Sequence, residues 1–428
     1  MQALETIRKR IAPLEEALSA YPDLWKVFSH CFLNTLETTV SQTEGDTFIL
    51  TGDIHAMWLR DSTAQVMHYL RFADDESVSE LILGLLSRQA KNILLDPYAN
   101  AFNREPSSYK PYDDRPRASD WVWERKYEID SLCNPIHLAW AFYEKTGNTS
   151  FLTERFHKAL QTVADVFLTE QHHENSPYRF ERSNCPPSDT LQNGGMGAPV
   201  AYTGMTWSGF RPSDDACAYG YLIPSNLFAA QEMRHAAAFA RILKDEALEK
   251  QAETLAKEIQ AGLDQFAHVH DPQFGDIFAY ETDGLGHYNL MDDANVPSLL
   301  ALPYLGICEK DDPTYLRTRA FVLSAKNPYY YSGTQATGIG SPHTPKGYIW
   351  PIALCVQGMT TDDTGEQAKL LNELMHTHAN CFCMHESFNP DDPNQFTREW
   401  FAWANSMFGE FIYRLYESGT LQEVLKKA

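Results

Sequence analysis

The sequence has few positive charges for its length. Its 428 residues include 35 Lys and Arg against 57 Asp and Glu, so the formal net charge at pH 7 is -22. Proteins that bind DNA or RNA neutralise phosphates with clustered Lys and Arg side chains. The same negative charge is repelled by anionic lipid surfaces. The composition therefore argues against nucleic acid and membrane surfaces as partners.

Long hydrophobic runs are also lacking. A membrane-spanning helix needs about 20 consecutive apolar residues, and no stretch of the sequence approaches that length. The first ten residues, MQALETIRKR, carry charges where a secretory signal has its hydrophobic segment. We therefore expect a soluble protein of the cytoplasm.

Standard cofactor and metal motifs are absent as well. The eight cysteines include no C-x-x-C pair, which suits reduced thiols inside a cell. The sequence has no G-x-S-x-G motif, phosphate loop or G-x-G-x-x-G motif. Possible metal ligands do cluster within ten positions, with the spacing H-x-H-x2-C-x-C-x-H: His376, His378, Cys381, Cys383 and His385. This spacing matches no standard zinc site, so we predict neither metal nor cofactor.

Helical periodicity dominates what is present. The clearest apolar stripe advances in steps of three and four residues from Leu248 to Phe266. Similar stripes occur at 78–93, 152–167 and 401–415. Weaker helical stretches are placed near 4–18, 23–38, 56–71, 131–145, 216–242, 297–307, 314–325, 349–358 and 366–378. About a dozen helices with little alternating strand pattern predict an all-α fold.

Long connections separate these helices, at 96–128, 173–214, 267–296, 326–347 and 379–395. Ordinary connections have about 4–6 residues, and the aromatic residues in these five argue against disorder. We interpret them as ordered loops that build an active site at one end of the fold. No break in composition divides the chain, so we expect residues 1–428 to form a single domain. An (α/α)6 barrel fits this organisation, although a helical solenoid fits the helix number equally well.

Five segments combine charged, aromatic and small residues at the predicted ends of helices. A sugar site needs aromatic platforms together with short, fixed hydrogen-bonding groups. Taken singly, each segment has a structural explanation, such as an ion pair or a core Trp. Together, on loops of a rigid scaffold, they favour a carbohydrate site. The segments are GDIHAMWLRDS (52–62), WVWERKYEIDS (121–131), TWSGFRPSDDA (206–216), DDANVP (292–297) with GIGSPHTP (338–345), and MHESF (384–388) with TREWFAWANS (397–406).

Cleavage of a glycosidic bond requires two carboxyl groups, one as acid and one as base or nucleophile. Asp214 and Asp215 precede a helix expected near 216, so either is suited to cap that helix. Glu386 lies in a predicted loop, whereas Glu399 lies on a predicted helix and is suited to a surface ion pair. The residue types alone leave the choice within each pair open.

The same segments, including YTGMTWSGFRPSDDAC and MDDANVPSLL, closely resemble glycoside hydrolase family 125 in order from about residue 22 to 415. The resemblance implies an (α/α)6 barrel and an exo-acting α-1,6-mannosidase that inverts configuration without metal. The implied substrate is an α-mannoside glycan, and the implied role is N-glycan degradation. The family's general acid, the first Asp of R-P-S-D-D, corresponds to Asp214. Its general base, the Glu of M-H-E, corresponds to Glu386.

The resemblance also suggests sugar contacts, and we expect the site to raise the pKa of Asp214 so that it holds a proton. Two positions depart from the family pattern, with His55 in place of Pro and Ser387 in place of Gly. Rival interpretations are another inverting barrel enzyme, such as an α-glucosidase or a disaccharide phosphorylase, and a catalytically silent glycan-binding protein. Oligomeric partners cannot be assigned from the sequence. The candidate sugar contacts are Trp58, Arg60, Asp61, Glu124, Arg125, Trp207, Arg211, Asp215, Asp293, Asn295, His343 and Arg398.

Overall fold

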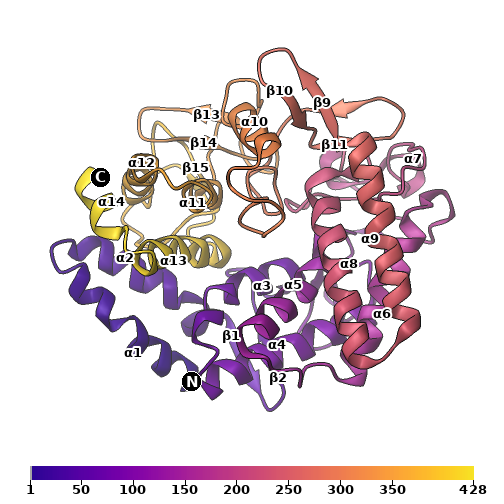
Figure 1. The fold of residues 1–428 in the computed structure, drawn as a ribbon, viewed down its shortest axis with the longest axis horizontal. Helices are drawn as coiled ribbons and strands as arrows, with labels where there is room; N and C mark the ends of the chain where they lie inside the picture. Colours follow the sequence, from indigo (N-terminus) through magenta and orange to yellow (C-terminus); the bar gives the residue numbers. More distant parts are fainter. Residues whose placement is uncertain (1) are drawn as a thin grey trace.

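Helices form most of the regular structure in the computed structural model, which describes residues 2–428 (Figure 1). This part of the chain contains fourteen α-helices. They are α1 (Gln2–Ala17), α2 (Pro22–Asn34), α3 (Leu59–Met67), α4 (Glu76–Leu95), α5 (Ile129–Thr146), α6 (Glu154–Glu170), α7 (Gln192–Gly195), α8 (Ile223–Leu243), α9 (Glu246–Phe266), α10 (Pro313–Val322), α11 (Pro351–Met359), α12 (Thr364–His376), α13 (Ala402–Glu417) and α14 (Leu421–Lys427). The prediction of an all-α fold is confirmed.

The strands are two to four residues long and pair antiparallel in small sheets within the connections. Three-stranded sheets join β3 to β4 and β6, and β8 to β11 and β12. The strands are β1 (Val40–Thr43), β2 (Asp46–Ile49), β3 (Met57–Trp58), β4 (Ala101–Phe102), β5 (Asp114–Arg115), β6 (Val122–Glu124), β7 (Glu181–Arg182), β8 (Tyr221–Leu222), β9 (His268–Asp271), β10 (Gly275–Phe278), β11 (Glu281–Thr282), β12 (Tyr288–Asn289), β13 (Tyr330–Ser332), β14 (Thr337–Ile339), β15 (Ser387–Phe388) and β16 (Phe396–Thr397).

An inner ring of helices carries the core. Helix α3 packs against α5 and α13, α5 packs against α8, and α11 packs against α13. The gap between α8 and α13 is bridged by the segment 298–307. Gln231 on α8 donates to the carbonyl of Leu305 (2.9 Å), and Tyr304 donates to Glu410 on α13 (2.9 Å). The ring is therefore closed by α3, α5, α8, α13 and one irregular segment, and α11 packs on α13.

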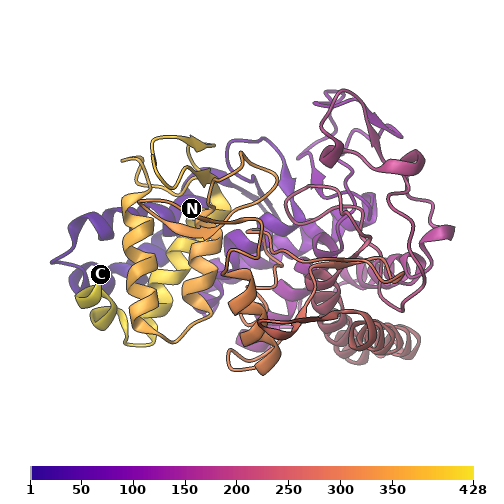
Figure 2. The same cartoon turned by 90° about the horizontal axis from the view of Figure 1, so that it is seen from above.

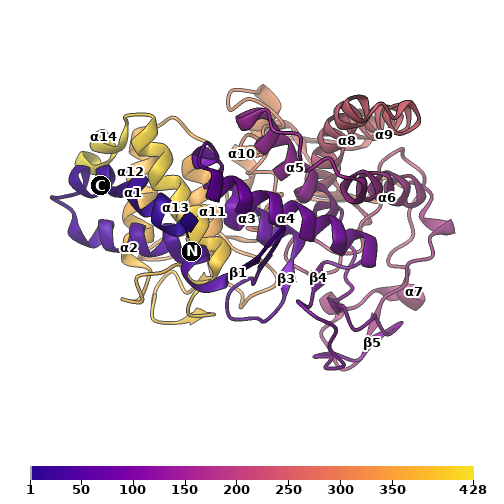
Figure 3. The ribbon, with the colours of Figure 1, turned by 90° about the horizontal axis from the view of Figure 1, so that it is seen from below.

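A second layer of helices surrounds this ring. Helix α4 packs against α5 and α6, α9 packs against α8 and α6, and α12 packs against α11. Helices α1 and α2, at the start of the chain, lie beside α13 and α14 at its end (Figures 1 and 3). The packing of α2 on α13 thus joins the first and last parts of the fold.

Most predicted helices are present, and two differ. The stripe at 248–266 is α9, with Leu248, Leu255 and Leu263 buried in the core. The prediction of a helix at 297–307 is wrong, because this stretch is a run of turns. Pro303 lacks the N–H that a helix would need there, and the Asp292 carboxylate accepts hydrogen bonds from the N–H groups of Leu299 and Leu300. Helix α8 begins at Ile223 rather than near 216, since Tyr221–Leu222 pairs with β11.

The loops gather on one side of the helices. Figure 3 shows β3, β4, β5 and α7 on the same side, and Figure 2 shows the loops rising beyond the helix ends. Among residues 2–428, none of the helices combines the length and the apolar character needed to cross a membrane.

Candidate active site

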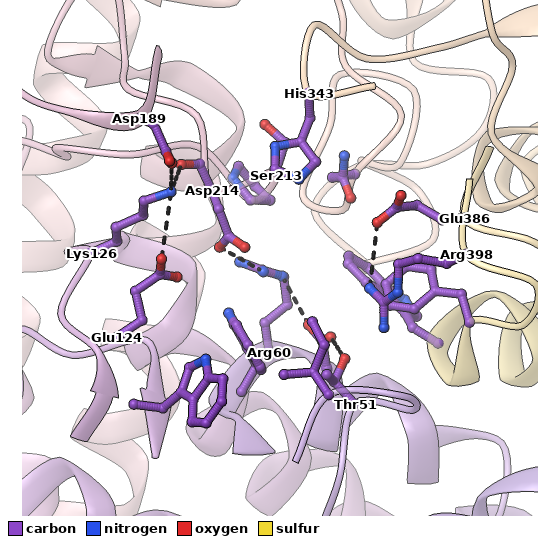
Figure 4. Close-up of a pocket in the computed structure, with 18 of the residues that line it drawn as sticks. Thr51, Arg60, Glu124, Lys126, Asp189, Ser213, Asp214, His343, Glu386 and Arg398 are labelled. Atoms are coloured by element: carbon purple, nitrogen blue, oxygen red, sulfur yellow. Dashed lines mark hydrogen bonds and ion pairs between the residues drawn. The ribbon is translucent and has the colours of Figure 1, made fainter. Parts of the chain in front are cut away.

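A cavity of about 400 Å³ opens among these loops, at the end of the inner ring. Three Trp side chains line it, with Trp58 from β3, Trp350 from the residue before α11 and Trp403 from α13. Charged side chains form much of the remaining wall (Figure 4). The combination of apolar faces and fixed polar groups suits a sugar ring.

Asp214 reaches this cavity from a tight turn. Its N–H donates to the carbonyl of Arg211 (2.9 Å), and the N–H of Arg211 donates to the carbonyl of Asp215 (2.8 Å). The backbone of Asp214 lies in the left-handed region, with φ of 68°, which is uncommon for a residue with a side chain. Because α8 begins only at Ile223, neither Asp214 nor Asp215 caps it, and the capping explanation is wrong.

Positive groups surround the Asp214 carboxylate. Arg60 Nη2 lies 3.5 Å from its Oδ1, and Asn100 Nδ2 donates to the same oxygen at 3.1 Å. Burial raises the pKa of Asp214, but Arg60, a hydrogen bond from Glu128 and the cations Lys126 and His343 together hold this pKa below its usual value. The expectation that the site raises the pKa of Asp214 is wrong, because these neighbours outweigh burial.

Arg60 is shared by four carboxyl groups. Its guanidinium lies 2.6 Å from Glu128, 3.2 Å from Asp130, 3.4 Å from Asp61 and 3.5 Å from Asp214. Burial raises the pKa of Glu128 well above its usual range and that of Asp130 to about 6. Arg60 therefore anchors a buried acidic cluster directly below Asp214.

Glu386 projects into the cavity from the side opposite Asp214 (Figure 4). It immediately precedes β15, which pairs with β16. The side chain of Asn405 on α13 accepts the N–H of Met384 (2.7 Å), which holds the backbone two residues before Glu386. Arg398 lies 3.4 Å from Glu386 and also donates to Asp53 (2.9 Å). The sheet, α13 and Arg398 together fix this carboxylate.

His343 lies near both carboxylates. Its Nδ1 is 3.2 Å from Asp215 Oδ1. Burial lowers the pKa of His343, but the hydrogen bond and charge of Asp215, with the charges of Asp214 and Glu386, raise this pKa to about 9. His343 is therefore a cation at neutral pH. Asp215 affects the cavity indirectly, by keeping His343 protonated.

Comparison with known proteins identifies the family. The family model for metal-independent α-mannosidases, glycoside hydrolase family 125, matches residues 21–413. The chain belongs to glycoside hydrolase family 125.

Two relatives match this family 125 protein over nearly its whole length. A metal-independent α-mannosidase of Streptococcus pneumoniae, solved in a non-productive complex with α-1,6-mannobiose, is 46% identical with a TM-score of 0.94, covering 96% of this chain and 98% of that chain. The meiotically up-regulated gene 157 protein of Schizosaccharomyces pombe is 38% identical over 442 residues, covering 96% of this chain and 86% of the relative.

A distant likeness supports the fold. A bacterial glucoamylase complexed with acarbose is 14% identical with a TM-score of 0.53, covering 90% of this chain and 52% of that chain. Several further glycosidases match at similar scores. With the closed inner ring and its outer layer, these likenesses confirm the predicted (α/α)6 barrel with loops around the site.

The structure brings nine of the fourteen predicted site residues of this family 125 protein to the cavity wall. They are Trp58, Arg60, Asp61, Glu124, Asp214, Asn295, His343, Glu386 and Arg398.

The other five lie outside the cavity wall, so their geometry gives no support for direct sugar contact. Arg125 pairs with Asp96 (2.7 Å), and Arg211 is buried against Glu281 (2.6 Å). Trp207 is buried and stacks on His173. Asp293 accepts from Asn295 (2.9 Å) and supports it from behind, as Asp215 supports His343.

Several cavity residues were missed by sequence reasoning. Trp123, Lys126, Ser213 and Phe401 stand within the motifs, so proximity to a motif was a usable signal. Tyr112, Arg182 and Asp189 come from parts of the long connections that lie outside the motifs. They reach the cavity because β5 pairs with β7, placing Asp114 opposite Arg182.

The remaining sequence features have clear positions. The His and Cys residues near 376–385 form no metal-binding group, and no group of three or more His, Cys, Asp or Glu suited to a metal ion occurs elsewhere in residues 2–428. Instead, His385 and Cys383 both contact the carbonyl of Glu399 (2.5 and 3.4 Å).

The two positions that depart from the family pattern differ in exposure. His55 is exposed, and Ser387 is buried, with its hydroxyl 2.7 Å from that of Thr397.

Proposed function

We propose that this protein removes terminal α-1,6-linked mannose from glycans and inverts the configuration at the anomeric carbon. The observation that carries the proposal is the placement of Asp214 and Glu386 on opposite sides of one cavity (Figure 4). The linkage is supported by the Streptococcus pneumoniae relative, whose structure holds α-1,6-mannobiose. The connection of that relative with N-linked glycans makes such glycans the proposed source of substrate.

In the proposed reaction, Asp214 donates a proton to the bridging oxygen as the glycosidic bond breaks. Glu386 takes a proton from a water that attacks the anomeric carbon from the other face. An inverting enzyme leaves room for that water, with its carboxyl groups about 6.5–9.5 Å apart. Arg398, 3.4 Å from Glu386, holds the carboxyl group of this base in place.

The terminal sugar would lie against the Trp side chains of the lining. Trp58, Trp350 and Trp403 offer apolar faces. Asp61 and Asn295 offer hydrogen-bonding groups to the hydroxyls, and Thr51 donates to Asp61 to fix its orientation. A hydrophobic core that includes residues from both α1 and α14 supports the further proposal that residues 1–428 act as one catalytic domain.

Substitution of the two carboxyl groups tests their roles. Asp214→Asn and Glu386→Gln should each lower kcat on α-1,6-mannobiose by about 10²–10⁴-fold, the usual contribution of acid–base catalysis, while the melting temperature is retained. Glu399→Gln is the matched control, since Glu399 is exposed and should leave kcat unchanged. Retained activity in either main variant would remove that residue from its role.

The product and the substrate range test the rest of the proposal. NMR should show β-mannose as the first product, and α-mannose first would contradict inversion. A panel of α-1,2-, α-1,3- and α-1,6-mannobioses should show preference for the last, with no effect of a chelator. Hydrolysis of α-glucosides instead, or a requirement for phosphate, would favour the rival barrel enzymes. Binding of mannosides without release of mannose would favour the silent binding protein.

A further inference from the structure

The acidic cluster below the cavity contains more negative groups than its cation can balance. Glu128 and Asp130 are fully buried beside Arg60, and Asp61 is nearly so. With Asp214, four carboxyl groups contact a single guanidinium. An unpaired buried carboxylate is strongly unfavourable and takes up a proton instead. The cluster therefore stores at least one proton.

Two members of the cluster share a hydrogen-bonding partner. Asn100 Nδ2 lies 3.2 Å from Glu128 Oε1 and 3.1 Å from Asp214 Oδ1, so the same amide contacts both carboxyl groups. When one of the two carboxyl groups is protonated, it can donate a hydrogen bond to the other, which raises the pKa of Glu128 and lowers that of Asp214. Glu128 has no exposed side-chain surface, whereas 21% of the Asp214 side chain is exposed to the cavity. A proton on Glu128 can thus reach solvent or substrate through Asp214.

The surrounding charges favour Glu128 over Asp214 as the group that holds that proton. Burial raises the pKa of Glu128, while Arg60, the Glu128 hydrogen bond and nearby cations lower that of Asp214. Asp214 in the free protein is then an ionised carboxylate that accepts a hydrogen bond. The proposed general acid consequently needs a source of its proton within the site.

We propose that Glu128 holds the proton of the general acid and passes it to Asp214 as Asp214 protonates the leaving oxygen. This inference rests on the proposed function. In the step, the O–H bond of Glu128 breaks and one forms on Asp214, whose proton moves to the glycosidic oxygen. Both carboxyl groups end ionised. The proton that Glu386 takes from water returns to solvent, and solvent reprotonates the Glu128–Asp214 pair, so no other reactant is needed.

Other charged groups facing the pair set the pH at which it loses its proton. Negative neighbours help to retain the proton and cations oppose this. From α3, α5, the β6 segment, the 183–191 loop and the loop after β14, these groups are Arg60, Asp61, Asp130, Glu124, Lys126, Asp189 and His343.

Glu128→Gln tests the step through the leaving group. The amide of Gln has no acidic proton to pass on and stabilises ionised Asp214 by donating to it. We expect kcat/KM on α-1,6-mannobiose to fall about 10²-fold, but by less than about threefold on 2,4-dinitrophenyl α-mannoside, whose leaving group needs no proton. Asp130→Asn is the matched control, because Asp130 contacts Arg60 without bonding to Asp214. At pH values below the alkaline limb, it should change kcat/KM on both substrates by the same factor.

The pH profile provides a readout that a merely structural role would not move. Glu128→Gln should shift the alkaline limb of kcat/KM to lower pH. Ser131→Ala removes the hydrogen bond that the Ser131 hydroxyl donates to Glu128 (2.8 Å), so it should shift that limb upward by about half a pH unit. Ser131→Ala also tests the role of Glu128 if the Glu128→Gln variant does not fold.

The two possible failures are distinguishable. Wild-type protein that leaves α-1,6-mannobiose intact would contradict the proposed function. Active wild-type protein in which Glu128→Gln slows both substrates equally would overturn the role of Glu128 alone. An alkaline limb that neither variant moves would do the same.

Discussion

Two arginines from neighbouring motifs show how strongly the environment decides what a guanidinium does. The side chain of Arg60 is only 4% exposed and contacts four carboxyl groups. Arg125 pairs with Asp96 alone and lies over the rings of Tyr98 and Tyr178. The planar fork of Arg60 can serve several acceptors at once, which the single ammonium of Lys cannot.

Lysine substitution at both positions should therefore have unequal effects. Arg60→Lys leaves buried carboxylates without a partner, so we expect the free energy of unfolding to fall by about 3–5 kcal/mol and mannobiose hydrolysis to be lost. Arg125→Lys should cost about 1 kcal/mol or less and change kcat/KM by less than about twofold. Urea unfolding and hydrolysis assays measure both. A large loss of activity in Arg125→Lys with unchanged stability would restore it as a sugar contact.

At the scale of elements, α13 links the stability of the barrel to the site. A side chain on Gly409 would meet the Cα of Phe32 on α2 at 2.9 Å, so the two helices approach more closely than an alanine permits. The same helix carries Asn405, which holds the backbone of Met384. Moving α13 would thus disturb Glu386 as well as the core.

Gly409→Ala should lower the free energy of unfolding by about 1–3 kcal/mol, the usual cost of overpacking, and should also reduce kcat. The matched control is Gly365→Ala in α12, which is exposed and faces only the side chain of Asp363. There the same change should be neutral or stabilising, by up to about 1 kcal/mol, because alanine restricts the unfolded chain. Thermal unfolding compares the two, and equal losses would argue against close packing of α2 and α13.

Elements that are specified by the periodicity of their own residues could be predicted from the sequence. Elements that depend on a particular side-chain contact could not. The stripe from Leu248 to Leu263 specifies α9 because each apolar residue lies on one helix face. The turns after Val296 depend on the Asp292 carboxylate bonding to Leu299 and Leu300, which periodicity cannot reveal.

The site residues likewise include some that the sequence motifs indicate and others that only the fold brings to the cavity. Arg60, Asp214 and Glu386 lie in dense motifs and reach the cavity. Arg182 reaches it only through the pairing of β5 with β7, for which the sequence gives no local sign. Trp207, also within a motif, proved to be core. Composition distinguishes a functional segment from its surroundings, but not which of its side chains faces inward.

For the whole molecule, charge makes stability depend on pH. The net charge of -22 is self-repulsive in the compact state. Buried groups whose pKa is raised in the folded protein also make it less stable as the pH rises. Burial raises the pKa of Asp292 to about 8, and Asp215 raises that of His343 to about 9. A raised folded-state pKa gives stability that is fully present below the unfolded value and is lost as pH rises through the folded value.

The melting temperature should therefore be higher at pH 7 than at pH 9, by roughly 2 °C or more. Between these values both His343 and Asp292 hold protons more tightly in the folded state than in the unfolded chain. The buried His68, whose pKa burial lowers to about 4, would oppose this only below about pH 6.5.

Salt and one variant separate the causes. At 0.5 M NaCl the repulsion between surface charges is screened, whereas buried groups are affected much less, so part of the difference should persist. Asp292→Asn should melt lower at both pH values, because it weakens the bonds to Leu299 and Leu300, but with a smaller difference between them. A melting temperature that is equal at pH 7 and pH 9 in high salt would show that surface repulsion alone sets the pH dependence, and that the buried groups do not hold their protons as the structure indicates.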